Sequence, residues 1–182
     1  SDMLVLAVAL FGLDVGLAVD RAGLVGADGE THHGCLDPLF LPALPGYTIL
    51  CPASFAELRR MLRTALFDLT GPVAVRYPRG GEGTYAGDAS GAPLVRLQAG
   101  KDAAILTYGT LVNQALAAAE LLAGRNVQAA VWKLNQIAPL EGEMLREYFE
   151  KTDILLGLED CFGAGCGGQR IAAILAADGL AP

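Results

Sequence analysis

Along this chain, short apolar runs alternate with longer stretches in which apolar residues recur at helical intervals. The short runs predict strands over residues 14–20, 47–51, 72–80, 103–109, 127–134 and 153–159. The longer stretches predict helices over residues 54–68, 110–124, 141–151 and 168–177. This alternation is typical of an α/β protein with mostly parallel sheets flanked by helices.

The helix predicted over residues 54–68 has a clear start signal. Ser54 stands three residues before Glu57, a capping-box spacing, and Pro52 ends the strand before it. The helical spacing predicts a buried face made by Phe55, Leu58, Leu62, Ala65 and Leu66. The opposite, solvated face would carry Arg59, Arg60 and Arg63.

A change of composition predicts how the chain is divided. Residues 80–93 read "GGEGTYAGDASGAP", and such small and polar residues bury too little surface to offset the entropy lost in ordering them. We therefore expect one partial domain over residues 1–80, a linker or exposed connection over 81–94, and a second domain over 95–182.

The first residues, "SDMLVLAVALFGLDVGLAV", are apolar for most of their length. Asp2 and Asp14 interrupt them and no basic segment precedes them, so a signal peptide or a membrane span fits poorly. We expect a buried helix end or strand here that leads into the buried strand over residues 14–20. Contact with a membrane is not expected.

Charge and cysteine content narrow the class of protein. The chain has 182 residues, 53% of them hydrophobic, and 13 Lys and Arg against 20 Asp and Glu give a formal net charge of −7. The apolar fraction argues against disorder, and the acidic balance without a basic stripe argues against nucleic-acid binding. The four cysteines lack a C-x-x-C pair, which predicts reduced, mostly buried thiols in a cytoplasmic protein and no zinc site.

Polar side chains that suit an anion gather at two predicted strand ends. The loop "VDRAGLVGADGETHHG" follows the strand over residues 14–20, and R-Y-P-R-G closes the strand over 72–80. Ligands of open α/β sheets bind at such carboxyl ends, and the arginine fork suits phosphate or carboxylate. If the two ends are neighbours, one crevice would receive Arg21, Asp28, His32, Arg76 and Arg79.

Two further patterns have competing interpretations. A carboxylate at Asp28 would orient the imidazole of His32 for proton transfer or for a hydrogen bond to a substrate hydroxyl, although exposed histidines are often plain surface residues. A metal site with His33 and Glu30 is disfavoured, because adjacent histidines point apart. The stretch "GAGCGGQR" lacks the order of a phosphate-binding loop, so we interpret it as tight packing at a helix start.

Five blocks of the chain resemble a known family. They are "DRAGLVGADGETHHG", "PASFAELRRMLRTAL", "GPVAVRYPRG", "ILTYGTLVNQAL" and "LEDCFGAGCGGQRIA". In this order they are similar to the 1-deoxy-D-xylulose-5-phosphate synthases, within the transketolase family of thiamin-diphosphate enzymes. D-G-x-T-H recurs among transketolases, whereas D-R-A-G and Y-P-R-G point to the synthases.

The resemblance implies a fragment with the later part of a pyrimidine-binding domain and the carboxyl-terminal domain of a homodimeric transferase. Such synthases condense pyruvate with glyceraldehyde 3-phosphate, release carbon dioxide and supply isoprenoid and thiamin precursors. By position in the motifs, Arg21 and Arg79 would bind the acceptor's phosphate. Asp28 and His32 would bind its hydroxyls, and His32 would also assist proton transfer as a catalytic residue.

The resemblance also has departures. The complete enzymes use thiamin diphosphate and magnesium, but no residue here matches their G-D-G motif or the glutamate that activates the cofactor, so we assign no cofactor contact and no metal ligand. We expect this chain alone to be inactive, because positioning both substrates is most of the task. The alternatives are a split transketolase subunit and a non-catalytic module that dimerises or binds a sugar phosphate.

Overall fold

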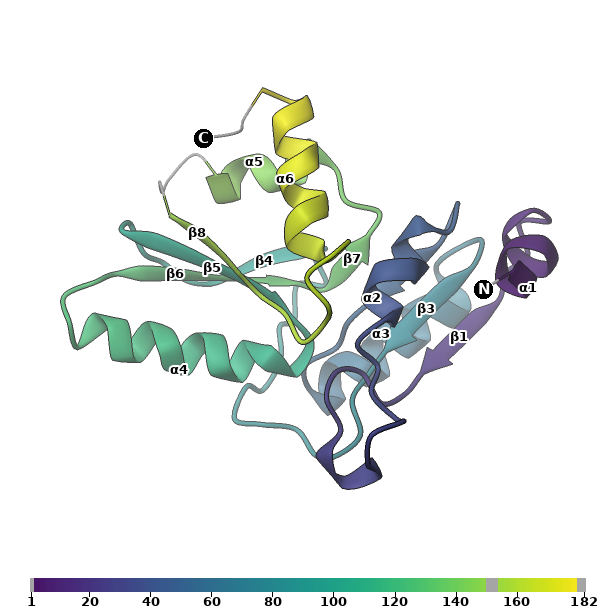
Figure 1. Cartoon of the computed structure of the whole chain (residues 1–182), viewed down its shortest axis with the longest axis horizontal. Helices are drawn as coiled ribbons and strands as arrows, with labels where there is room; N and C mark the ends of the chain where they lie inside the picture. The colour runs from purple at the N-terminus through teal and green to yellow at the C-terminus, as the bar shows by residue number, and fades with distance from the viewer. Residues whose placement is uncertain (1, 150–153, 180–182) are drawn as a thin grey trace.

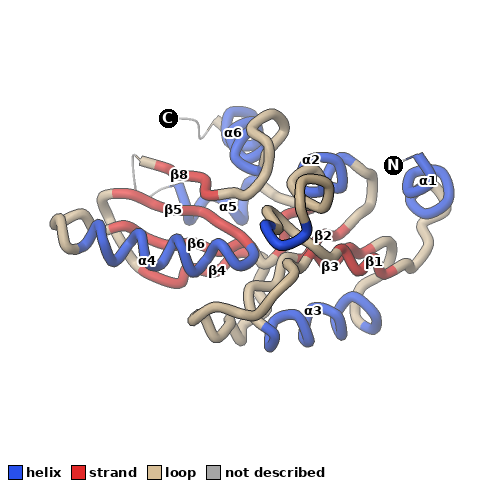
Figure 2. The backbone as a smooth tube through the Cα atoms, turned by 60° about the horizontal axis from the view of Figure 1, so that its bottom comes forward, coloured by secondary structure: helices blue, strands red, loops and turns tan. Residues whose placement is uncertain are grey.

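The computed structural model describes residues 2–149 and 154–179 and shows two sheets side by side (Figure 1). The strand order is β1-β3-β2-β7 in the first sheet and β4-β6-β5-β8 in the second. Four of the six strand pairings are parallel and helices lie against both sheets (Figure 2). The predicted α/β class with mostly parallel sheets is confirmed.

The first sheet is built mainly from the first half of the chain. Its parallel strands are β1 (Gly16–Val19), β3 (Val73–Arg76) and β2 (Thr48–Leu50). After β1, the helices of this half are the short α2 (Asp37–Phe40) and the long α3 (Phe55–Phe67). β1 is the edge strand and its residues are half-buried or exposed, so the prediction of a fully buried strand over 14–20 is wrong.

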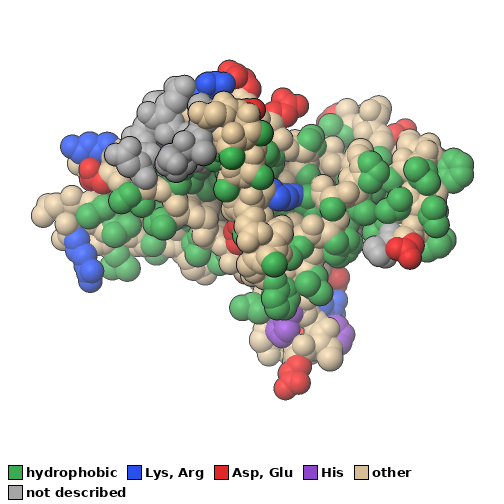
Figure 3. Space-filling model, turned by 45° about the horizontal axis from the view of Figure 1, so that its top comes forward, with side chains coloured by type: hydrophobic (Ala, Val, Ile, Leu, Met, Phe, Trp, Pro, Cys, Tyr) green, Lys and Arg blue, Asp and Glu red, His purple; other side chains and the backbone are tan. Residues whose placement is uncertain are grey.

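The residues before β1 form helix α1 (Asp2–Leu4), which continues as a π-helical turn over Val5–Ala9. One side of this segment packs on the core through Leu4, Val8 and Ala9. The other side leaves apolar residues exposed, so the expected burial is wrong there; they are Met3, Leu6, Leu10 and Phe11. Hydrophobic side chains are visible on the surface at this end of the molecule (Figure 3). Within the described ranges, no helix has the length and apolar character needed to cross a bilayer.

The second sheet comes from the second half of the chain. Its strands are β4 (Leu94–Gln98), β6 (Ala129–Leu134), β5 (Ala103–Tyr108) and β8 (Leu155–Leu158). Helix α4 (Val112–Ala123) covers one face, and α5 (Gly142–Phe149) with α6 (Gly167–Ala177) covers the other (Figure 1). The helix predicted over 141–151 and the strand predicted over 153–159 extend into residues 150–153, which lie outside the described residues. Among the described residues, three short 3-10 turns complete the elements, η2 (Gly26–Asp28), η3 (Leu41–Ala43) and η4 (Gly109–Leu111).

Two strands were not predicted, and one of them ties the halves together. β4 is an antiparallel edge strand that begins directly after the glycine-rich connection. β7 (Gln136–Ala138) belongs to the second half but pairs antiparallel with β2 of the first sheet. The largest core cluster likewise holds buried residues of both sheets, among them Ile49 and Trp132. The halves are therefore interlocked, and the division at residues 81–94 stays a prediction.

Helix α3 confirms its predicted start but not all of its buried face. Ser54 Oγ accepts a hydrogen bond from the Glu57 N–H at 3.2 Å. Met61 is buried and Leu58, Leu62 and Ala65 are half-buried, but Phe55 is 51% and Leu66 65% exposed. A helix turns by about 100° per residue. Because Glu57 faces inward, Phe55, two residues before it, and Leu66, nine residues after it, must face away from the core.

Glu57 faces inward because it forms a buried ion pair with Lys133 of β6. Glu57 Oε2 lies 3.0 Å from Lys133 Nζ, and both side chains are fully buried. The same oxygen accepts a hydrogen bond from the Ala53 N–H at 2.8 Å. Burial would raise the pKa of Glu57, but Lys133 and two backbone N–H groups outweigh burial and hold that pKa below its ordinary value.

We predict that Lys133→Met costs about 3–5 kcal/mol of unfolding free energy at about pH 7, because it leaves the Glu57 carboxylate buried without a counter-charge. In the wild type the stability contributed by Glu57 is present above its ordinary pKa of 4.5 and is lost as the pH falls below that value. The unpaired Glu57 of the variant takes up a proton more readily, so the deficit should shrink in acid. Urea unfolding at about pH 7 and about pH 4.5 measures both values. The exposed Lys101→Met is the control, and a deficit that is small or independent of pH would contradict the prediction.

Candidate functional site at the carboxyl ends of β1 and β3

The register of the first sheet places the two candidate segments at one edge. β1 and β3 run parallel with Val19 opposite Arg76. The pairing continues beyond the strands, since the Tyr77 N–H donates to the Val19 carbonyl at 2.9 Å and the Ala22 N–H donates to the Tyr77 carbonyl at 3.1 Å. The loop after β1 and the R-Y-P-R-G segment are therefore neighbours, as expected.

An ionic cluster forms where these segments meet. Asp28 Oδ2 lies 2.8 Å from Arg21 Nε, and Asp28 Oδ1 pairs with Arg79 Nη1. Asp28 is only 12% exposed, whereas Arg21 is 39% and Arg79 52% exposed. Asp20 also pairs with Arg21. Because each guanidinium has five N–H donors, both arginines keep donors that can face a ligand.

The two histidines lie on the same loop but outside this cluster. The His33 ring nitrogen Nδ1 accepts a hydrogen bond from the Val25 N–H at 2.9 Å, so His33 supports the loop. His32 is exposed, and its Nδ1 lies 2.9 Å from Thr31 Oγ1. No hydrogen bond joins His32 to Asp28 in the part of the chain that the structure describes. Figure 3 shows the histidine side chains on a lobe that projects from the body of the molecule.

Arg76 does not face the crevice, contrary to expectation. Its side chain is 3% exposed, with Nε 2.6 Å from Asp37 Oδ2 and Nη2 3.6 Å from Asp160 Oδ1. Nη2 also donates to the Gly34 carbonyl at 2.7 Å, and the guanidinium lies over the Tyr108 ring. Burial raises the pKa of Asp37, and the charge of Arg76 opposes that effect. Arg76 is a buried residue of β3, so its charge needs buried partners. Through Gly34 and Asp160 it joins the loop after β1 to the second half of the chain.

Two glycines close the base of the loop that carries Arg21 and Asp28. The Gly23 N–H donates to the Gly34 carbonyl at 3.1 Å, and the Gly34 N–H donates to the Gly23 carbonyl at 2.9 Å. A Cβ atom on Gly34 would lie 2.4 Å from the Arg21 carbonyl oxygen. Gly23 has a φ of 76°, and a Cβ there would collide with the Asp160 carboxylate. The loop can close, and Asp160 can approach it, only because neither position carries a side chain.

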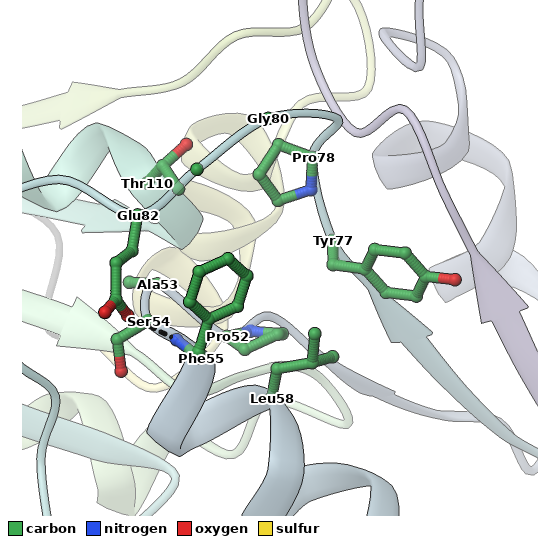
Figure 4. A pocket seen from close by; sticks show the side chains of 11 residues that line it. Pro52, Ala53, Ser54, Phe55, Leu58, Tyr77, Pro78, Gly80, Glu82 and Thr110 are labelled. Atoms are coloured by element: carbon green, nitrogen blue, oxygen red, sulfur yellow. Dashed lines mark hydrogen bonds between the residues drawn. The ribbon is translucent and has the colours of Figure 1, made fainter.

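Two cavities lie beside the cluster. One has a volume of about 430 Å³. It is lined by Arg79 and Glu82, which follow β3, and by residues of the second half, Thr110, Asn113 and Asp160. The other, of about 230 Å³, is mainly apolar and lies between the start of α3 and the end of β3. Figure 4 shows the side chains that line this second cavity. Phe55 and Pro78 lie among them, while the Tyr77 ring points away from Phe55. The larger cavity has a size that suits a small ligand and borders an arginine of the cluster.

Sequence reasoning missed Asp160 and Asn113. Asp160 follows β8, so the rule about carboxyl ends of strands could have found it; Asn113 lies at the start of α4 and carries no comparable signal. The neighbouring Glu159 accepts hydrogen bonds from the N–H groups of Gly167 and Gly168 at 2.9 and 2.7 Å. A Cβ on Gly167 would lie 2.9 Å from that carboxylate, which confirms the predicted tight packing at this helix start.

The four cysteines are free, with Cys35 and Cys51 buried and Cys161 and Cys166 half-buried. The described residues contain no group of three or more His, Cys, Asp or Glu side chains placed to hold a metal ion. We therefore assign no residue to magnesium or to a diphosphate and derive no chemical step through them.

The family model "Transketolase, pyrimidine binding domain" matches residues 1–81, and "Transketolase, C-terminal domain" matches residues 93–181. The chain therefore belongs to the transketolase family. This membership implies thiamin diphosphate as the cofactor.

Within that family, curated relatives are 1-deoxy-D-xylulose-5-phosphate synthases, which confirms the predicted resemblance. The one from Chlorobaculum tepidum is 45% identical over 149 residues, covering 79% of this chain and 24% of the relative. The one from Dechloromonas aromatica is 41% identical over 191 residues, covering 98% of this chain and 29% of the relative. The chain thus spans less than a third of the length of these relatives.

Solved structures agree in fold. "Split gene transketolase, inactive beta4 tetramer" has a TM-score of 0.85 and 26% identity, covering 97% of this chain and 58% of that one. A mutant transketolase from Pichia stipitis has a TM-score of 0.67 at 18% identity, covering 96% of this chain and 29% of that one, and shows the shared fold alone.

We predict that Gly34→Ala destabilises the protein by about 1–3 kcal/mol, because the new methyl group meets a backbone oxygen that cannot move aside. The melting temperature should fall by roughly 2–4 °C per kcal/mol in a protein of this size. Gly26→Ala is the matched control in the same loop, since nothing lies within 4 Å of a Cβ there. Equal melting temperatures for the two variants would show that the loop base is looser than described.

Proposed function

We propose that this chain forms part of a thiamin-diphosphate-dependent 1-deoxy-D-xylulose-5-phosphate synthase. The complete enzyme would condense pyruvate with glyceraldehyde 3-phosphate, release carbon dioxide and supply isoprenoid and thiamin precursors. The observation that carries the proposal is the convergence of Arg21 and Arg79 on Asp28, beside a cavity of about 430 Å³.

In this proposal the two arginines bind the phosphate of the acceptor. Asp28 aligns both guanidinium groups, so their geometry is set before the ligand arrives. Asp20 and Asp28 balance the two positive charges, and an incoming phosphate offers more charge and more acceptor oxygens than either carboxylate alone. An otherwise acidic chain thereby gains a local anion site.

Thiamin diphosphate, when bound, supplies the carbanion chemistry, and the residues of this chain bind and orient the acceptor. His32 enters the proposal through its position in D-G-E-T-H, since the structure leaves it exposed on the loop. It acts in catalysis if the loop tip closes toward the cavity with substrate present.

A split transketolase subunit is the second candidate. The observation in its favour is the similarity to the split-gene transketolase structure, which covers 97% of this chain at a TM-score of 0.85. A non-catalytic module that dimerises or binds a sugar phosphate would share the arginine cluster but show no turnover.

Complementation separates these candidates. The chain is mixed with a separately produced thiamin-diphosphate-binding domain of a synthase relative, and carbon dioxide release from pyruvate is measured with glyceraldehyde 3-phosphate. A synthase should form deoxyxylulose phosphate, and a transketolase subunit should instead transfer a ketol group between sugar phosphates. Silence in every mixture would oppose both enzymes, and the chain alone should be inactive.

We predict that Arg79→Ala in the active mixture raises the KM for glyceraldehyde 3-phosphate roughly ten- to a hundred-fold, because a charge-assisted hydrogen bond is worth about 1.5–3 kcal/mol. Pyruvate decarboxylation should survive, since the donor carries no phosphate. The control is Arg125→Ala, an exposed arginine beyond the end of α4. An unchanged acceptor KM would remove Arg79 from the site.

We predict that His32→Ala lowers kcat roughly a hundred-fold or more with little effect on the acceptor KM, as expected for loss of a proton-transfer group. Steady-state kinetics on the mixture measures both constants. Glu30→Ala, which changes an exposed residue of the same loop, controls for general effects on the loop. Full turnover in His32→Ala would end the catalytic role of this residue.

A further inference from the structure

The glycine-rich connection, residues 80–93, is held in place although it contains no helix or strand. Its Tyr85 hydroxyl donates a hydrogen bond to Glu57 Oε1 at 3.0 Å. The Asp88 N–H donates to the same oxygen at 2.9 Å. The carboxylate of Glu57, buried at the start of α3, thus fixes two points of a segment whose composition predicts an exposed linker.

Lys133 holds the connection from the second half of the chain. Its ammonium pairs with Glu57, hydrogen-bonds to Asn135 Oδ1 and lies 5.9 Å from the centre of the Tyr85 ring. Asn135 Nδ2 in turn donates to the Ala92 carbonyl at 2.8 Å. One buried network therefore reaches both the middle and the far end of the connection.

The other side of the connection packs on the start of α4. Asn113 Oδ1 accepts a hydrogen bond from the Tyr85 N–H at 2.9 Å, and Asn113 Nδ2 donates to the Thr110 carbonyl at 2.9 Å. Gly83 lies so close that a Cβ there would be 2.5 Å from the Asn113 amide. Tyr85 is thus held at two points: Asn113 of the second half bonds to its backbone N–H, and Glu57 of the first half bonds to its hydroxyl.

Residues 79–83, at the start of this connection, form one wall of the candidate acceptor cavity. Arg79, Gly81, Glu82 and Gly83 all line the cavity of about 430 Å³, and Asn113 of α4 lines it too. The Glu82 carboxylate also accepts a hydrogen bond from the Phe55 N–H at 2.6 Å. The position of this wall, which includes Arg79, therefore depends on contacts made outside the cavity.

We propose that Tyr85 is a positioning residue for acceptor binding. Held by Glu57 and Lys133, it keeps residues 79–83 in the position that the acceptor requires. Tyr85 does not line the cavity, so it acts through the segment that does. The inference rests on the proposed function, because it takes the cavity beside Arg79 as the acceptor site.

Tyr85→Phe tests this without unfolding the network. Substitution of Glu57 or Lys133 would leave a buried charge unpaired, and global instability would then hide any effect on the site. Removing the Tyr85 hydroxyl keeps the ring, its contact with Lys133 and the backbone bond to Asn113. Tyr47→Phe is the matched control, because it also removes a single hydroxyl, one that bonds to the Leu4 carbonyl at the other end of the first sheet.

Two measurements are made on each variant. Amide hydrogen exchange of the chain should be roughly tenfold faster at residues 80–88 in Tyr85→Phe, and unchanged there in Tyr47→Phe. In the complemented mixture, Tyr85→Phe should raise the KM for glyceraldehyde 3-phosphate roughly three- to tenfold with kcat and pyruvate decarboxylation unchanged. A purely structural role would lower the melting temperature without this split between KM and kcat.

Unchanged exchange at residues 80–88 would overturn the inference, because Tyr85 would then not hold the segment. Faster exchange with an unchanged acceptor KM would overturn the link to the acceptor. If Arg79→Ala leaves the acceptor KM unchanged, the proposed function of the cavity fails. The exchange result would still decide whether Tyr85 holds the segment.

Discussion

The ion pair between Glu57 and Lys133 is the constraint on which most of the arrangement depends. Two charges without solvent contact are expensive to bury, and the cost is offset only when every lone pair and proton finds a partner. Here the partners come from the turn before α3, from the connection and from Asn135, which lies between β6 and β7. The pair therefore fixes which side of α3 faces inward, anchors residues 80–93 and joins α3 of the first half to β6 of the second.

The candidate site depends on the parallel register of β1 and β3. β1 and β3 are far apart in the chain, yet their pairing delivers Arg21 and Arg79 to one edge, where Asp28 lies between them. The second half adds Asp160 and Asn113 to the adjoining cavity. A net charge of −7 does not by itself prevent anion binding, because each guanidinium has more N–H donors than its pairing with Asp28 uses.

The sequence predicted features governed by local rules. The α/β alternation, the capping interaction of Ser54 and the packing of Gly167 follow from neighbours in the chain, and the structure contains them. Arg76 and Arg79 illustrate the limit. Their residue types and spacing are equivalent in R-Y-P-R, but one lies within a buried strand and the other beyond Pro78, so only the second reaches the crevice. β7 forms because it pairs with β2, and Glu57 faces inward because it pairs with Lys133. Each partner belongs to the other half of the chain, so no local sequence pattern predicts either feature.

The antiparallel pairing of β7 with β2 decides what a cut in the connection would separate. If a protease nicked the glycine-rich stretch, neither product could leave without stripping a strand from a sheet and uncovering apolar surface shared by both. The severed pieces would stay together as a noncovalent complex.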